Sequence, residues 1–139
     1  MRTALCGIII MILLCSCGKK EIKPVSEESK IAQEAFKLAE VIKEAYIKND
    51  RVTIQRNSTK DGYKEMISIM KDFDDAELTF IPKKVEIEDS TVYLNLTWSG
   101  KWTIGGKKIE DRGLAIFVME GKPLKLSRVV RENPFRQPE

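Results

Sequence analysis

Residues 92–98 read VYLNLTW, with an apolar side chain at every second position. Because successive side chains of a β-strand point to opposite faces, this alternation predicts a strand with one buried face. We expect further strands over residues 78–87, 114–119 and 124–131. Proline cannot donate a hydrogen bond within a sheet, so Pro82 predicts an edge strand or a bulge. The second half of the chain therefore predicts an antiparallel sheet of four to five strands.

Glycines and charged residues indicate where these strands end. Ser99-Gly100 and Gly105-Gly106 flank a short segment, residues 102–104, and both pairs are typical of turns. The charged residues 110–112 directly precede the apolar strand at 114–119, and we expect them at a polar hairpin end.

The first half of the chain has helical periodicity instead. Apolar residues recur every three or four positions over residues 26–49, with Ser26 as a good N-cap. A second helix, capped by Ser58 or Thr59, is expected over about residues 59–73. The connection between them is predicted to be a turn with a short helix or an irregular segment. Helices followed by strands indicate an α+β domain, with the helices packed on one face of the sheet.

The N-terminal residues have the pattern of a secretory signal. Arg2 precedes an apolar run over residues 4–14, which is too short to span a bilayer, since a spanning helix needs roughly 20 apolar residues. Leu14-Cys15-Ser16-Cys17 resembles the lipobox of bacterial lipoproteins. In that family the cysteine receives a diacylglycerol and the signal before it is removed. An uncleaved short anchor and ordinary secretion are the alternatives.

The lipobox resemblance implies a division of the chain. We expect a signal peptide over residues 1–16, a tether over 17–25, one domain over 26–135 and a polar tail over 136–139. The membrane is then a partner through lipidated Cys17. The predicted location is the cell envelope, on the periplasmic side of the outer membrane in a bacterium with two membranes.

Composition excludes several classes of function. The sequence has 3 cysteines and no histidine, and none of the cysteines remains as a free thiol if Cys17 is lipidated. Catalytic triads, Cys-His pairs and zinc sites all lack their usual residues. The acidic residues 72, 74 and 75 lack the loop glycine and the distal glutamate of an EF-hand, so a solvated turn is favoured and no metal or cofactor is expected. The 24 basic and 21 acidic residues are spread along the chain, which does not indicate a nucleic-acid partner.

The order of elements resembles the nuclear-transport-factor-2-like (NTF2-like), or cystatin-like cone, superfamily. The likeness rests on the helix at 32–50, the strands at 92–98 and 113–119, and the ending RVVRENPF at 128–135. It implies a curved sheet wrapped round the long helix, leaving a conical pocket. Because the superfamily includes isomerases, dehydratases and noncatalytic binding modules, the fold does not determine the function.

Two functions are therefore considered. The first is a noncatalytic module that binds a small-molecule ligand or a protein partner through the cone or the open face of the sheet. The second is an isomerase- or dehydratase-type enzyme that uses Asp111 or Tyr46 in the pocket. Trp98, Trp102 and Arg112 complete the candidate site, although ordinary sheet packing is the alternative role for the two indoles.

Overall fold

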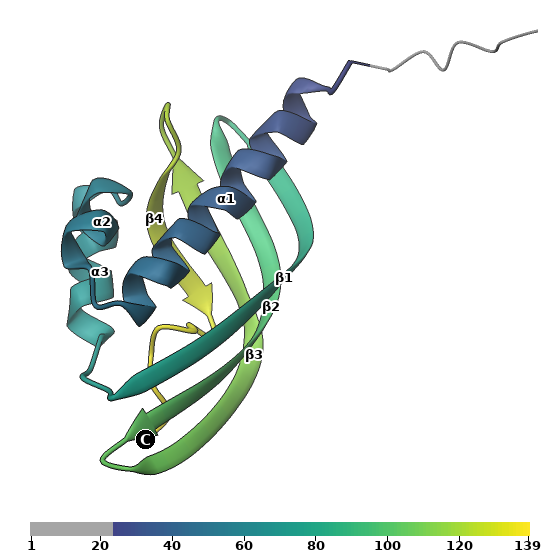
Figure 1. Cartoon of the computed structure of the whole chain (residues 1–139). Coiled ribbons are helices and arrows are strands. Elements are labelled where there is room, and N and C mark those ends of the chain that lie inside the picture. The colour runs from purple at the N-terminus through teal and green to yellow at the C-terminus, as the bar shows by residue number, and fades with distance from the viewer. Residues whose placement is uncertain (1–23) are drawn as a thin grey trace, which may run out of the picture.

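A computed structural model describes residues 24–139, so the predicted signal peptide and Cys17 lie outside the described residues. Three helices precede four strands within this range (Figure 1). The predicted α+β class is confirmed. The elements are α1 (Glu27–Ile47), α2 (Arg51–Arg56), α3 (Lys60–Ile69), β1 (Asp75–Glu88), β2 (Thr91–Ile104), β3 (Lys107–Glu120) and β4 (Lys125–Arg131).

The sheet is fully antiparallel, with the strand order β1-β2-β3-β4. Asp89 and Ser90 join β1 to β2, and Gly105 and Gly106 join β2 to β3. All four turn residues have positive φ angles between 45° and 78°, as the tight turns that fit the twist of a hairpin require. The predicted interruption at Pro82 is confirmed, because the register of β1 against β2 shifts between Pro82 and Lys84.

Each helix begins at a side-chain cap. The hydroxyl of Ser26 accepts a hydrogen bond from Ser29 N at 3.1 Å, and the Thr59 hydroxyl accepts one from Gly62 N at 3.1 Å. Such caps satisfy backbone N–H groups that have no partner within the helix. The first helix and its cap agree with the prediction. The second predicted helix is α3, which ends at Ile69 rather than near residue 73, because Met70 adopts an extended backbone.

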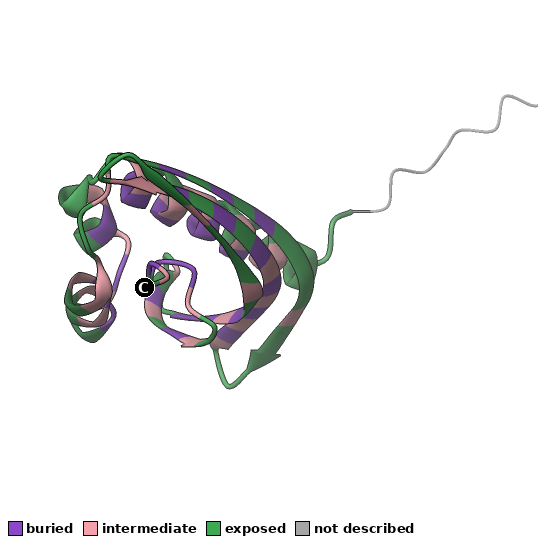
Figure 2. Cartoon of the chain, turned by 90° about the horizontal axis from the view of Figure 1, so that it is seen from below, coloured by how far each residue is buried: buried purple, intermediate pink, exposed green. Residues whose placement is uncertain are grey.

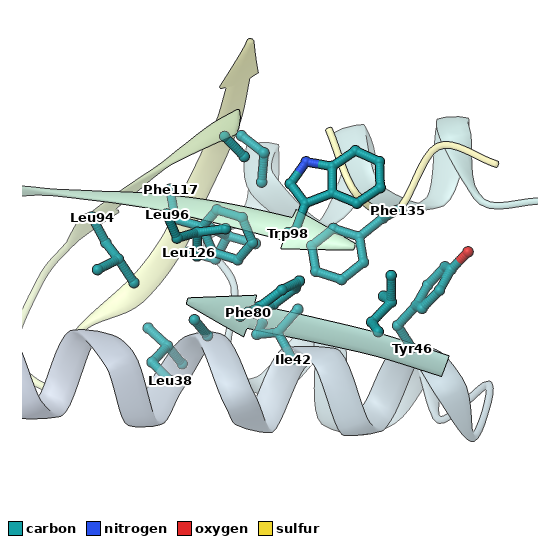
Figure 3. Close-up of a cluster of buried hydrophobic side chains, with 14 of the residues drawn as sticks. Leu38, Ile42, Tyr46, Phe80, Leu94, Leu96, Trp98, Phe117, Leu126 and Phe135 are labelled. Atoms are coloured by element: carbon teal, nitrogen blue, oxygen red, sulfur yellow. The ribbon is translucent and has the colours of Figure 1, made fainter. Parts of the chain in front are cut away.

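The core lies between α1 and the concave face of the sheet. Leu38, Ile42 and Tyr46 recur at helical spacing and face Phe80 of β1 and Leu94 of β2 (Figure 3). These side chains are buried. Burial of a large apolar side chain contributes roughly 1.5–3 kcal/mol, so this stripe holds the helix on the sheet.

Helix α3 covers the other edge of the sheet, at β4. Thr59 N donates to Leu126 O at 2.8 Å, and Leu126 N donates to Asn57 O at 2.9 Å. A Cβ atom on Gly62 would collide with the carbonyl oxygen of Leu126 and would lie 2.9 Å from that of Ser127. Gly62, a weak helix former, is therefore suited to this position because it lets the helix approach the strand backbone closely.

No helix within residues 24–139 has both the length and the apolar character needed to cross a membrane.

Candidate functional site

Trp98 and Trp102 lie on the inward face of one continuous strand. Their rings meet edge to face, with centroids 6.3 Å apart. Between them, Gly100 is paired within β2, so the predicted turn at residues 99–100 is wrong. The physical reason is packing: a Cβ atom at this position would collide with the Trp102 ring and lie 2.8 Å from Leu78 Cδ2. Gly100 makes room for the indole inside the strand.

The N–H groups of both indoles already have partners. Trp102 Nε1 donates to the Tyr46 hydroxyl at 2.9 Å, and Trp98 Nε1 donates to Glu132 O at 2.8 Å. Trp102 is 1% exposed and Trp98 is 5% exposed. In this arrangement the two indoles pack the core, which is the alternative role that the sequence left open.

Tyr46 is fully buried at the end of α1, between the rings of Phe73 and Phe135, whose centroids lie 5.2 and 5.1 Å away. Burial raises the pKa of its hydroxyl, although the hydrogen bond with Trp102 acts in the opposite direction. Loss of its proton near neutral pH is therefore disfavoured, and solvent does not reach it. The geometry does not support Tyr46 as a general base.

The C-terminal segment fills the cone. Figure 2 shows the sheet curving round this segment, and Figure 3 shows the Phe135 ring among the core side chains. Phe135 is fully buried, with ring centroids 5.7 Å from Phe117 and 6.1 Å from Phe80. The expected polar tail is also docked, because Gln137 is buried and donates to Lys71 O at 2.6 Å. The chain's own residues occupy the space that a ligand would take in an open cone.

An open groove of about 490 Å³ remains beside this segment. Its lining includes Trp98, Asp111, Glu132 and Arg136. Asp111 lies in the middle of β3, opposite Gly100, and not at the polar hairpin end that the sequence predicted. Its side chain is exposed, whereas an enzymatic base of the proposed type requires a carboxylate enclosed in an apolar cone.

Arg112 faces the opposite side of the sheet from Asp111. Since neighbouring residues of a strand alternate, it shares the outward face with its pairing partner Ser99. A shallow hollow of about 390 Å³ lies there, beside the ion pair between Lys101 and Glu110 at 3.6 Å. The side chains of Asp111 and Arg112, which the sequence placed in one site, therefore lie on opposite faces of the sheet, although both residues border this hollow.

The outward face also carries apolar residues that the sequence analysis did not single out. Ile81, Thr97 and Leu114 form one row across β1, β2 and β3. Ile81 is 51% exposed and Leu114 is 40% exposed, and Ile116 and Val130 form part of the next row. The apolar run at 114–119 contains this signal, but a run that is apolar at every position does not show which residues face outward.

Within residues 24–139, no three His, Cys, Asp or Glu side chains are grouped to hold a metal ion.

The fold is similar to that of an NTF2-like superfamily protein from Salmonella enterica subsp. enterica serovar Typhimurium str. LT2. The TM-score is 0.60 at 10% identity, over 80% of this chain and 99% of that one. The fold is NTF2-like. A conserved protein from Planctomyces limnophilus DSM 3776 is also similar, with a TM-score of 0.58 at 16% identity over 71% of this chain and 92% of that one. No protein-family model matches the sequence, and no curated protein does.

The NTF2-like cone expected from the sequence is therefore present, but aromatic residues of this chain fill its interior. Of the predicted site residues, Tyr46, Trp98 and Trp102 belong to the core. Asp111 and Arg112 are exposed on opposite faces of the sheet. Within residues 24–139, the outward face of the sheet carries the exposed apolar row of Ile81 and Leu114.

Proposed function

We propose that this chain is a lipid-anchored module of the bacterial cell envelope that binds a protein partner through the outward face of its sheet. The observation that carries the proposal is the filled cone. Phe135 and Tyr46 occupy the interior, and Trp102 closes it with a hydrogen bond. This arrangement favours binding on the outside of the sheet over catalysis in the cone.

The outward face has the composition of a small protein interface. Its centre is the row Ile81, Thr97 and Leu114, with two exposed aliphatic side chains. Charged pairs lie within two rows on either side, namely Lys84 with Glu86 at 2.7 Å and Lys101 with Glu110 at 3.6 Å. An apolar centre inside a polar rim is typical of protein–protein contacts.

The predicted lipid anchor would hold this face near a membrane. Residues 18–25 span at most about 25–30 Å when fully extended, so the domain would stay close to the lipid headgroups. A Cys17→Ser variant tests the anchor. We expect acyl groups on the N-terminal peptide of the wild-type protein and none on the variant, as measured by mass spectrometry. An acylated Cys17→Ser chain would overturn the proposal.

The partner face is tested by photocrosslinking the full-length protein in cells. A photoreactive phenylalanine analogue at position 114 is compared with the same analogue at position 52, because Val52 is 64% exposed on α2. We expect a discrete crosslinked product from position 114 only. The Ile81→Asp substitution should remove most of that product, because it places a charge at the centre of the apolar row.

Two results would contradict partner binding at this face. One is an equal yield of crosslinked product from positions 52 and 114. The other is a yield at position 114 that Ile81→Asp leaves unchanged while the protein stays folded. A product of twice the chain's mass would identify the partner as a second copy.

A further inference from the structure

A hollow of about 540 Å³ lies at the end of the molecule where α1 begins. It is bordered by the first turns of α1 and by the β1–β2 and β3–β4 turns, which Figure 1 shows at the same end of the molecule. Its volume falls within the range of ligand pockets, about 300–1,000 Å³. Its apolar lining consists of Ile31, Ile87, Val92, Pro123 and Leu124.

The acidic side chains at this hollow restrict what it can bind. Glu34 Oε1 accepts a hydrogen bond from Leu124 N at 3.1 Å, which ties α1 to the β3–β4 turn. Glu27 also lines the hollow and forms an ion pair with Lys30 at 3.0 Å. Lys122 is the one cation among the lining residues that the structure describes. Two carboxylates disfavour a ligand that carries its own carboxylate, so the lining fits an uncharged acyl chain better than a free fatty acid.

We propose that this hollow binds one of the acyl chains attached to Cys17, an inference that rests on the proposed lipidation. Glu27 is both the first residue of α1 and part of the hollow, and it follows the predicted tether in the sequence. Cys17 lies only ten residues before Glu27, so the segment between them can extend at most roughly 33–36 Å and keeps the acyl chains near this end of the domain. Attachment also raises the local concentration of the chain, so a weak pocket is sufficient.

The pocket itself is tested first without the anchor. Within residues 24–139, the buried core extends from Ala35 to Phe135, so a chain beginning at residue 18 retains this core and lacks Cys17. This chain is titrated with decanoyl-N-methylglucamide, an uncharged single-chain probe, and with decanoate, both below their micelle concentrations. Methyl NMR signals of Ile31, Ile87 and Val92 report binding. We expect the uncharged probe to bind at least fivefold more tightly than decanoate.

Two isoleucines of β1 provide a matched pair of variants. Ile87 is 39% exposed and lines the hollow, whereas Ile81 is 51% exposed on the outward face. Ile87→Lys should weaken probe binding at least tenfold, and Ile81→Lys should leave it unchanged. An absence of probe-dependent shifts in the wild-type chain, or equal binding by the Ile87→Lys variant, would overturn the pocket.

The acylated full-length protein then tests the occupant. Mass spectrometry of the N-terminal peptide shows whether Cys17 is acylated, so failure of the proposed anchor is recognised separately. In acylated protein we expect the methyl signals of the hollow to resemble those of the probe-bound domain, and Ile87→Lys to abolish this resemblance. Acylated protein whose signals match the empty domain would overturn binding of the Cys17 acyl chain.

Discussion

The indole nitrogen of Trp102 donates a buried hydrogen bond of 2.9 Å to the hydroxyl of Tyr46, joining β2 to the last turn of α1. The two residues are 56 positions apart in the sequence, and both are almost completely inaccessible. An unpaired polar atom at either position would lose its contact with water without compensation. The pair therefore helps to fix the long helix against the sheet at this end of the cone.

Replacing Tyr46 with phenylalanine should reduce the free energy of unfolding by about 1–3 kcal/mol, because the Trp102 N–H group would be left buried without its partner. Urea unfolding at pH 7 measures this loss. Tyr93→Phe, at a half-buried position on the outward face of β2, is the matched control and should change stability by less than about 0.5 kcal/mol. Equal effects of the two substitutions would show that the hydrogen bond does not stabilise the fold.

The raised pKa of the same tyrosine, Tyr46, predicts that the protein loses stability at alkaline pH. Burial raises the pKa of Tyr46 in the folded state above the ordinary value of 10.0. Above pH 10.0 the unfolded chain loses this proton while the folded chain still holds it, so the free energy of unfolding falls as the pH rises toward the folded pKa. Urea unfolding between pH 8 and 11 should show a smaller decrease for Tyr46→Phe than for wild type. If the stability of the two proteins decreased with pH to the same extent, the raised pKa of Tyr46 would be contradicted.

Gly100 should tolerate no side chain while Trp102 is present. Alanine at this position would meet the indole ring and Leu78 Cδ2, and overpacking of a core typically costs about 1–3 kcal/mol. Ser99→Ala, at the adjacent exposed position, is the control. If the indole is the obstacle, Gly100→Ala should cost less in a Trp102→Leu background, which a double-mutant cycle of urea unfolding measures. If the effects of Gly100→Ala and Trp102→Leu on stability were additive, the Trp102 ring would not be the obstacle to a side chain at position 100.

The elements with a clear period were predictable from the sequence, and the tertiary contacts were not. The alternation at 92–98 and the apolar stripe of α1 predicted their strand and helix correctly. Gly100 was interpreted as part of a turn. A local sequence pattern does not show that the Trp102 ring packs against Gly100 within the same strand. The helical period likewise continued to Phe73, whose ring packs on Tyr46 from the loop after α3.

The sequence did not show how the candidate site residues are arranged, for a related physical reason. Sequence identifies residue types that bind ligands or partners, but it does not show whether a tryptophan faces a pocket or fills it. Trp98 and Trp102 are almost completely buried. Asp111 and Arg112 lie on opposite faces of the sheet because neighbouring strand residues alternate. The filling of the cone depends on Phe135 reaching the core from beyond the last strand, a long-range contact with no local signal.

Truncating this ring, as Phe135→Ala, should therefore destabilise the protein by about 3–5 kcal/mol, since the residue is fully buried and contacts three other aromatic rings. Arg136→Ala, at the next and exposed position, is the control. An apolar cavity of this kind binds small apolar molecules, so benzene should raise the thermal unfolding midpoint of Phe135→Ala and leave that of wild type unchanged. A Phe135→Ala variant as stable as wild type, or one insensitive to benzene, would show that the tail does not fill the cone in solution, and a small-molecule function for the interior would regain its support.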